Sequence, residues 1–167
     1  MDAPVLNLAD IHPEPLPAPY APTGPAALIY APRVARIGAR LGSARLGVNL
    51  IALAPGKRAF PFHNHRANDE LFHVLQGEGE LRLGTEVHPL RAGDLVACPA
   101  GGPETAHQIV NTGKAELRYL AYGTNSLPDV IEYPDSGLYK TMAAPAAEGE
   151  PPFHAIGRLD RNEDYWA

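Results

Sequence analysis

Short runs of alternating apolar and polar residues recur along the middle of the chain, and glycine or proline separates each run from the next. Examples are LGVNLIALAPG, ELFHVLQG, GELRLG, EVHPLRAG and ELRYLAYG. A two-residue period is typical of strands with one buried face, and runs that recur about every eight to twelve residues are typical of β-sandwiches and barrels. No window of helical length carries a convincing apolar stripe of helical period. The pattern therefore predicts an antiparallel all-β domain.

Prolines are unevenly distributed along the 167-residue chain, and seven of the eighteen lie in residues 1–25. Proline lacks a backbone donor and disfavours helix, so this stretch is expected to be extended. We predict an N-terminal arm over residues 1–39 with one possible added strand, a β-barrel over residues 40–123, and an irregular C-terminal extension over residues 124–167. Small residues and prolines at 143–152 favour the irregular assignment.

Composition narrows the class of protein. The apolar fraction of 45% is ordinary for a globular domain, and no apolar run reaches membrane-spanning length. A formal net charge of −5 gives no basic surface for nucleic acid or anionic lipid. Met1 is followed by Asp2 and then by prolines, which is unlike a signal peptide, and Cys98 is the single cysteine. We expect a cytoplasmic protein with a small-molecule substrate and no nucleic-acid or membrane partner.

Three histidines and a glutamate form the candidate site. His63 and His65 lie two residues apart, so on a strand both side chains project to the same side. Glu70 follows across a short turn, where an antiparallel strand would return it to that face, and His107 lies in GGPETAHQIVN. Imidazoles and a carboxylate that converge would bind one divalent ion and leave coordination positions open. The donor set suits Fe, Mn, Ni, Co, Cu and Zn, and does not choose among them.

Two segments resemble the motifs of the cupin family. The segment from Gly56 to Gly77 is similar to the first motif, and the segment that begins at Gly93 is similar to the second. The matching residues are His63, His65, Glu70 and Gly77 in the first, and Gly93, Pro99, Gly101, His107 and Asn111 in the second. The chain departs from the pattern in two loops, with one extra residue before His63 and three extra residues between Gly101 and His107.

The resemblance implies a double-stranded β-helix, or jelly-roll barrel, with a metal ion near its centre, commonly as a homodimer. The later stretch YGTNSLPDVIEYPDSG resembles the tail of one branch of single-domain cupins, whose members are sometimes labelled sugar-phosphate isomerase-like. The proline-rich stretch and the LIYAPRVARIG that follows it are expected to add a strand to the sheet edge of a partner. We therefore predict a homodimer whose association weakens when residues 1–25 are removed, with a flexible tail as the alternative.

The function that this site predicts is a metal-dependent enzyme acting on a small anionic or hydroxy-carbonyl compound, either an isomerase or a dioxygenase. The alternative is a non-catalytic module that binds or senses a small molecule. Glu104 is a candidate catalytic acid/base and Thr105 a candidate positioning group, although a solvated loop glutamate is the alternative reading. An isomerase of sugar phosphates would need cations for the phosphate. The candidates are Arg58, Arg66, Arg82, Arg91 and Arg118.

Three further residues are assigned structural roles. His73 lies three positions after Glu70, so strand parity places it on the opposite face, where a packed or interface histidine is expected. Cys98 lies in an apolar run and is expected to be a buried small hydrophobe. Gly77 is expected at a turn position that requires a positive φ.

Overall fold

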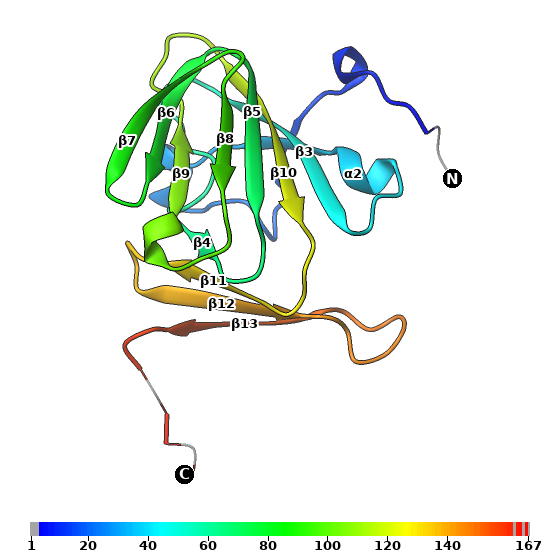
Figure 1. The fold of residues 1–167 in the computed structure, drawn as a ribbon, viewed down its shortest axis with the longest axis vertical. Coiled ribbons are helices and arrows are strands. Elements are labelled where there is room, and N and C mark those ends of the chain that lie inside the picture. Colours follow the sequence, from blue (N-terminus) through cyan, green and yellow to red (C-terminus); the bar gives the residue numbers. More distant parts are fainter. Residues whose placement is uncertain (1–3, 162, 165, 167) are drawn as a thin grey trace.

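The computed structural model describes residues 4–161, 163, 164 and 166, and its regular elements are almost all strands (Figure 1). The helical elements are single turns, namely η1 (Leu8–Asp10), α1 (Ala26–Ile29), α2 (Ile37–Arg40) and η2 (Pro103–Thr105). The strands are β1 (Glu14–Pro15), β2 (Arg33–Arg36), β3 (Leu46–Leu53), β4 (Asn64–His65), β5 (Glu70–Gln76), β6 (Glu78–Leu83), β7 (Glu86–Arg91), β8 (Leu95–Cys98), β9 (His107–Val110), β10 (Leu117–Thr124), β11 (Asp129–Tyr133), β12 (Leu138–Ala143) and β13 (Phe153–Arg158).

Two antiparallel sheets form the jelly roll. One has the strand order β1-β2-β3-β10-β5-β8 and the other the order β7-β6-β9. Their inner faces enclose a core that includes Leu53, Val74, Leu81, Ile109 and Tyr119, each at most 3% exposed. The alternation that the sequence shows places these side chains on one face of each strand. The prediction of an antiparallel all-β jelly roll is confirmed.

The turn between β5 and β6 requires its glycine. Gly77 has a φ of 84°, a conformation that residues with a Cβ rarely adopt. A Cβ at this position would also collide with the backbone oxygen of Glu116. The expected role of Gly77 at a turn is confirmed.

The N-terminal arm packs on the jelly roll. Within it, β2 pairs antiparallel with β3 of the same chain, and β1 pairs with β2. Ile11 and Ile37 are buried against Leu50 and Leu120, which face outward from β3 and β10. The outer face of the larger sheet is apolar as well as the inner one, and this second apolar cluster shields it from water. The possible added strand of the arm therefore extends the chain's own sheet.

The C-terminal extension is not irregular, so that part of the sequence prediction is wrong. Strands β11, β12 and β13 form a sheet with β4 in the order β13-β12-β11-β4, which lies below the jelly roll in Figure 1. Gly137, with a φ of 66°, lies in the turn between β11 and β12. The prolines and small residues of 143–152 lie mainly in the loop between β12 and β13, and this local composition hid the strands on either side.

No helix among the described residues has the length and apolar character needed to cross a bilayer.

Candidate metal centre

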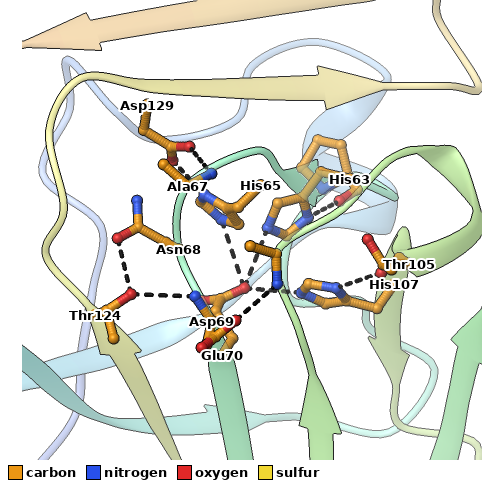
Figure 2. Close-up of polar contacts among 12 residues, drawn as sticks. His63, His65, Ala67, Asn68, Asp69, Glu70, Thr105, His107, Thr124 and Asp129 are labelled. Atoms are coloured by element: carbon orange, nitrogen blue, oxygen red, sulfur yellow. Dashed lines mark hydrogen bonds and ion pairs between the residues drawn. The ribbon is translucent and has the colours of Figure 1, made fainter.

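The four residues of the candidate site come from three strands, each in a different sheet, and one loop. His65 lies on β4, Glu70 is the first residue of β5, and His107 is the first residue of β9. His63 precedes β4 and forms a two-way backbone hydrogen-bonded bridge with His107. Figure 2 shows the three imidazole rings turned toward the carboxylate of Glu70.

One oxygen of Glu70 is the point on which the imidazoles converge. Its Oε2 lies 2.8 Å from Nε2 of His107, 3.5 Å from Nε2 of His65 and 3.8 Å from Nε2 of His63. His63, Glu70 and His107 offer ligand atoms that all lie within 4.8 Å of one another, close enough for one ion to contact them all. The structure thus brings together the four residues that the sequence singled out, with His65 slightly outside the tightest group.

While Nε2 of each histidine faces Glu70, the second ring nitrogen, Nδ1, holds the ring in place through a hydrogen bond. Nδ1 of His63 is 2.7 Å from the carbonyl oxygen of Pro61, and Nδ1 of His107 is 3.2 Å from that of Thr105. Nδ1 of His65 is 2.6 Å from Oδ2 of Asp129. An acceptor at Nδ1 keeps a proton there, so each imidazole, once it is neutral, directs the Nε2 lone pair at the centre. This is the tautomer that binding a metal ion through Nε2 requires.

Asp129 is a residue of the candidate site that the sequence did not indicate. It lies at the start of β11, is 4% exposed, and uses its second oxygen to accept a hydrogen bond from the backbone N–H of Ala67. The pairing of β11 with β4 brings it beside His65. No spacing rule links the two residues, because 64 positions separate them. Only recognition of β11 as a strand would have indicated the contact.

The neighbouring Asp69 points away from the centre, as strand parity predicts. Its carboxylate accepts a hydrogen bond from the backbone N–H of Ala100, and its own N–H donates to the hydroxyl of Thr124. Asn68 accepts from that hydroxyl as well (Figure 2). These bonds tie the turn that carries Glu70 to β10 and to the loop after β8.

Burial and mutual proximity set the charges at the centre. Burial lowers the pKa of His63 to about 4, with a further contribution from nearby His107, so this imidazole is neutral at pH 7. Burial also opposes charge on His107, but hydrogen bonds with Cys98 and Glu70 outweigh it and raise its pKa to about 10. The His107 contact likewise outweighs burial at Glu70 and keeps the carboxyl pKa below its ordinary value. A cation at the centre would replace the proton that His107 shares with Glu70.

Two cavities meet at this centre. The larger, of about 600 Å³, has His63, Glu70 and His107 in its walls, together with residues 14–17 of the N-terminal arm. The smaller, of about 320 Å³, contacts His65, Glu70 and Asp129 and is otherwise rich in amides and hydroxyls. The larger volume is within the range of small-molecule sites.

The loop residues proposed as catalytic groups lie apart from these cavities. Glu104 is exposed, and its carboxylate accepts a hydrogen bond from the backbone N–H of Gly102. Backbone hydrogen bonds at Glu104 and Gly102 hold its pKa below the ordinary value. The hydroxyl of Thr105 donates to the carbonyl of Gly102. Neither residue is among the described residues that line the two cavities, so this geometry does not favour the predicted role of Glu104.

The arginines that were candidates for phosphate binding are also engaged elsewhere or outside the two cavities. Arg66 pairs with Glu132 at 2.8 Å, and Arg82 pairs with Asp135 at 2.7 Å. Arg58 donates to the side chain of Gln108. None of the five named arginines is among the described residues that line either cavity.

Cys98 and His73 behave as expected. Cys98 is 1% exposed and lies directly opposite Glu70 in the β5–β8 pairing. His73 is a partly buried residue of β5 three positions beyond Glu70, and it is absent from the walls of both cavities.

Comparison with known proteins places this geometry in a family. The model of the cupin domain matches residues 49–123. Two curated relatives match over 69 residues: an uncharacterized protein of Methanocaldococcus jannaschii at 30% identity, and an oxalate-binding protein of Thermotoga maritima at 33% identity. Each alignment covers 41% of this chain, and the chain spans about half the length of these curated relatives, 53% and 54%.

Solved structures match over more of the chain. A sugar phosphate isomerase of the cupin superfamily from Silicibacter pomeroyi is 30% identical, with 94% of both chains covered and a TM-score of 0.77. A protein from Acidithiobacillus ferrooxidans is 24% identical, with 96% of both chains covered and the same TM-score, which shows the shared fold. The similarity therefore includes the terminal extensions as well as the jelly roll. The chain belongs to the cupin superfamily.

Proposed function

We propose that this protein is a metal-dependent enzyme that acts on a small anionic or hydroxy-carbonyl compound. One divalent ion per chain would be held by His63, His65, Glu70 and His107. The observation that carries the proposal is the convergence of three Nε2 atoms on one oxygen of Glu70, with every Nδ1 already bonded to an acceptor.

The donor set fits a divalent transition metal. Imidazole nitrogen and carboxylate oxygen suit Fe, Mn, Co, Ni, Cu and Zn, and four protein ligands leave two positions for a substrate in a six-coordinate site. When bound, such an ion would supply Lewis acidity to a carbonyl or hydroxyl oxygen. The carboxylate of Asp129 would hold His65 in the orientation that the ion requires.

The walls of the larger cavity suit a small substrate. Ile51, Phe72 and Ile109 supply apolar surface that limits water around the centre, while Asn49 and Gln108 supply polar groups. The amide of Gln108 donates to the carbonyl of Phe60 at 2.6 Å, which fixes its orientation in the wall. A compound with a few hydroxyl groups matches such a mixed surface.

An isomerase reaction is favoured over a dioxygenase reaction, because the relative from Silicibacter pomeroyi that matches 94% of this chain bears the name sugar phosphate isomerase. A dioxygenase would need a redox-active ion and would consume oxygen in the presence of its substrate. Oxygen-electrode measurements with metal-loaded protein distinguish the two reactions. A homodimer and a cytoplasmic location remain predictions.

The test combines metal analysis with turnover. We expect elemental analysis to find one transition-metal ion per chain, and His63→Ala to lower that content and abolish product formation from hydroxy-aldehydes or their phosphates. Thermal unfolding of the same samples shows whether the variant still folds. The proposal fails if purified protein takes up no stoichiometric metal and His63→Ala changes neither metal binding nor melting temperature.

A non-catalytic binding module is the second candidate. It is favoured by the relative from Thermotoga maritima, which bears the name oxalate-binding protein and shares 33% identity over 69 residues. A binding module would show saturable affinity for oxalate or a similar dicarboxylate and leave the compound intact. Product analysis by chromatography after prolonged incubation decides between the two functions.

A further inference from the structure

Arg36, the last residue of β2, brings a positive charge to the larger cavity. It is the only lysine or arginine among the described residues that line this cavity. The other charged groups there are the carboxylates of Glu14 and Glu70, together with His63 and His107. Glu70 is already engaged by the imidazoles, so it does not neutralise Arg36. The guanidinium of Arg36 is therefore available to bind an anionic ligand.

The sheet register fixes where Arg36 lies relative to the metal centre. Arg36 pairs with Asn49 on β3, Asn49 with Ala121 on β10, and Ala121 with Phe72 on β5. Arg36, Asn49, Ala121 and Phe72 all line the cavity, so this row crosses its wall. Glu70 lies in the next row along β5, two residues from Phe72. Because three strand spacings separate β2 from β5, the backbones of Arg36 and Glu70 lie roughly 15 Å apart.

Two glycines occupy the row of Glu70 itself. Gly123 pairs with both Glu70 and Gly47, so no side chain rises from β3 or β10 beside the carboxylate. Ala121 presents only a methyl group in the row of Arg36. Ala121 lines the larger cavity, whereas Gly47 and Gly123 line the smaller cavity, which shares Asn49, Glu70 and Ala121 with it. Asn49 is therefore the one sizeable side chain that β3 and β10 place between Arg36 and Glu70 in these two rows.

The side chain of Arg36 has no polar partner among the described residues, in contrast to several other arginines of the protein. Arg33, on the same strand, forms an ion pair with Glu116, and Arg66 and Arg82 pair with carboxylates as well. Within the described part of the chain Arg36 makes no side-chain hydrogen bond or ion pair. A guanidinium has five N–H donors and binds carboxylate or phosphate with two parallel hydrogen bonds.

We propose that Arg36 binds the terminal anionic group, phosphate or carboxylate, of a substrate whose hydroxy-carbonyl end lies at the metal centre. This inference rests on the proposed function and narrows its substrate class to hydroxy-aldehydes, hydroxy-ketones or hydroxy-acids of about three to six carbons. That length follows from the roughly 15 Å between the two backbones, part of which the arginine and glutamate side chains span. Glu14, at the same cavity, weakens binding of such an anion through like charge.

The test compares three hexoses that differ at carbon six: glucose, glucose 6-phosphate and glucuronate. Isothermal titration of metal-loaded protein should show at least tenfold tighter binding of one of the anions than of glucose, because charged hydrogen bonds are the stronger class. A shorter pair, dihydroxyacetone and its phosphate, covers a three-carbon chain. The two anions separate phosphate recognition from carboxylate recognition.

Arg36→Gln should remove the preference for the anion and leave the affinity for the neutral compound within about twofold. Arg40→Gln is the matched control, since it removes the same charge from an exposed residue that does not line the cavity. Glu14→Gln should tighten binding of the anion by about two- to fivefold. Arg36 and Glu14 are exposed, so both variants are expected to fold, and thermal melts verify this.

The proposal is overturned if Arg36→Gln keeps the anion preference, or if neither terminal anion improves binding to the wild-type protein at any chain length. Metal content is measured on the same samples. If the protein has normal metal content but no preference for the anion, the proposed role of Arg36 is wrong and the proposed metal-dependent function is unaffected. If the protein binds no metal, the role of Arg36 and the metal-dependent function are both wrong.

Discussion

The hydrogen bond between Asp129 and His65 gives the sharpest prediction about the metal centre. Asp129 has two acceptor oxygens and uses both, at 2.6 Å to His65 and 3.0 Å to the backbone N–H of Ala67. Asn at this position would have one oxygen for two donors. If that oxygen stays with Ala67, the new amide N–H faces Nδ1 of His65 and favours the tautomer with its proton on Nε2, which is the atom directed at the centre.

We therefore expect Asp129→Asn to weaken metal affinity by ten- to hundredfold, the usual cost of losing a carboxylate behind a ligand histidine. This corresponds to roughly 1.4–2.7 kcal/mol of binding free energy. Competition with a chromophoric zinc chelator measures the affinity. The effect should disappear in a His65→Ala background, because Asp129 acts through that ring.

Glu132→Gln is the matched control for this experiment. Glu132 lies on the same strand, is 7% exposed, and hydrogen-bonds Arg66 and Asn64 instead of a site histidine. Both variants should lower the melting temperature, since each disturbs a buried carboxylate, but Glu132→Gln should leave metal affinity within about twofold. The reasoning is refuted if Asp129→Asn binds zinc as tightly as the wild type, or if both variants weaken binding equally.

Other properties of the structure give three further predictions. His107 carries a proton below its raised pKa of about 10, so metal binding should release about one proton. The logarithm of the metal affinity should therefore rise by about one per pH unit between about pH 6 and 9, as measured by calorimetric titration in buffers of different ionisation enthalpy. A metal affinity that is independent of pH would contradict this. Gly77→Ala should lower the free energy of unfolding by more than about 1 kcal/mol in urea denaturation, because it adds a Cβ at a φ of 84° and against the backbone of Glu116. An unchanged midpoint of the urea unfolding curve would contradict the turn assignment. Ile37→Ala should cost about 2–5 kcal/mol, since it empties part of the buried cluster beneath the arm; a loss below 0.5 kcal/mol would show that the arm does not pack there.

Much of the candidate site could be predicted from residues that lie close together in the sequence. His63, His65 and Glu70 lie within eight residues, so strand parity and a short turn suffice to bring them to one face. His107 comes from a distant strand, and the resemblance to the second cupin motif supplied it. Alternation and glycine turns at regular spacing predicted the antiparallel all-β domain, and the resemblance to the cupin family supplied the jelly roll.

The residues that escaped prediction depend on long-range pairing. Asp129 meets His65 only because β11 joins β4, and Arg36 reaches the cavity only because β2 joins the edge of the larger sheet. Neither pairing has a local signature, and the prolines near β12 and β13 concealed the C-terminal sheet. Glu104 was selected for its closeness to His107 along the chain, but the loop turns its carboxylate back to Gly102.

X-ray absorption spectroscopy of protein reconstituted with zinc or cobalt tests the central claim most directly. We predict one ion per chain, with nitrogen and oxygen ligands at about 2.0–2.2 Å and the multiple-scattering signal of three imidazoles. His63→Ala, His65→Ala and His107→Ala should each reduce that signal by one ring. A coordination shell without imidazole, or one that survives all three substitutions unchanged, would contradict the account.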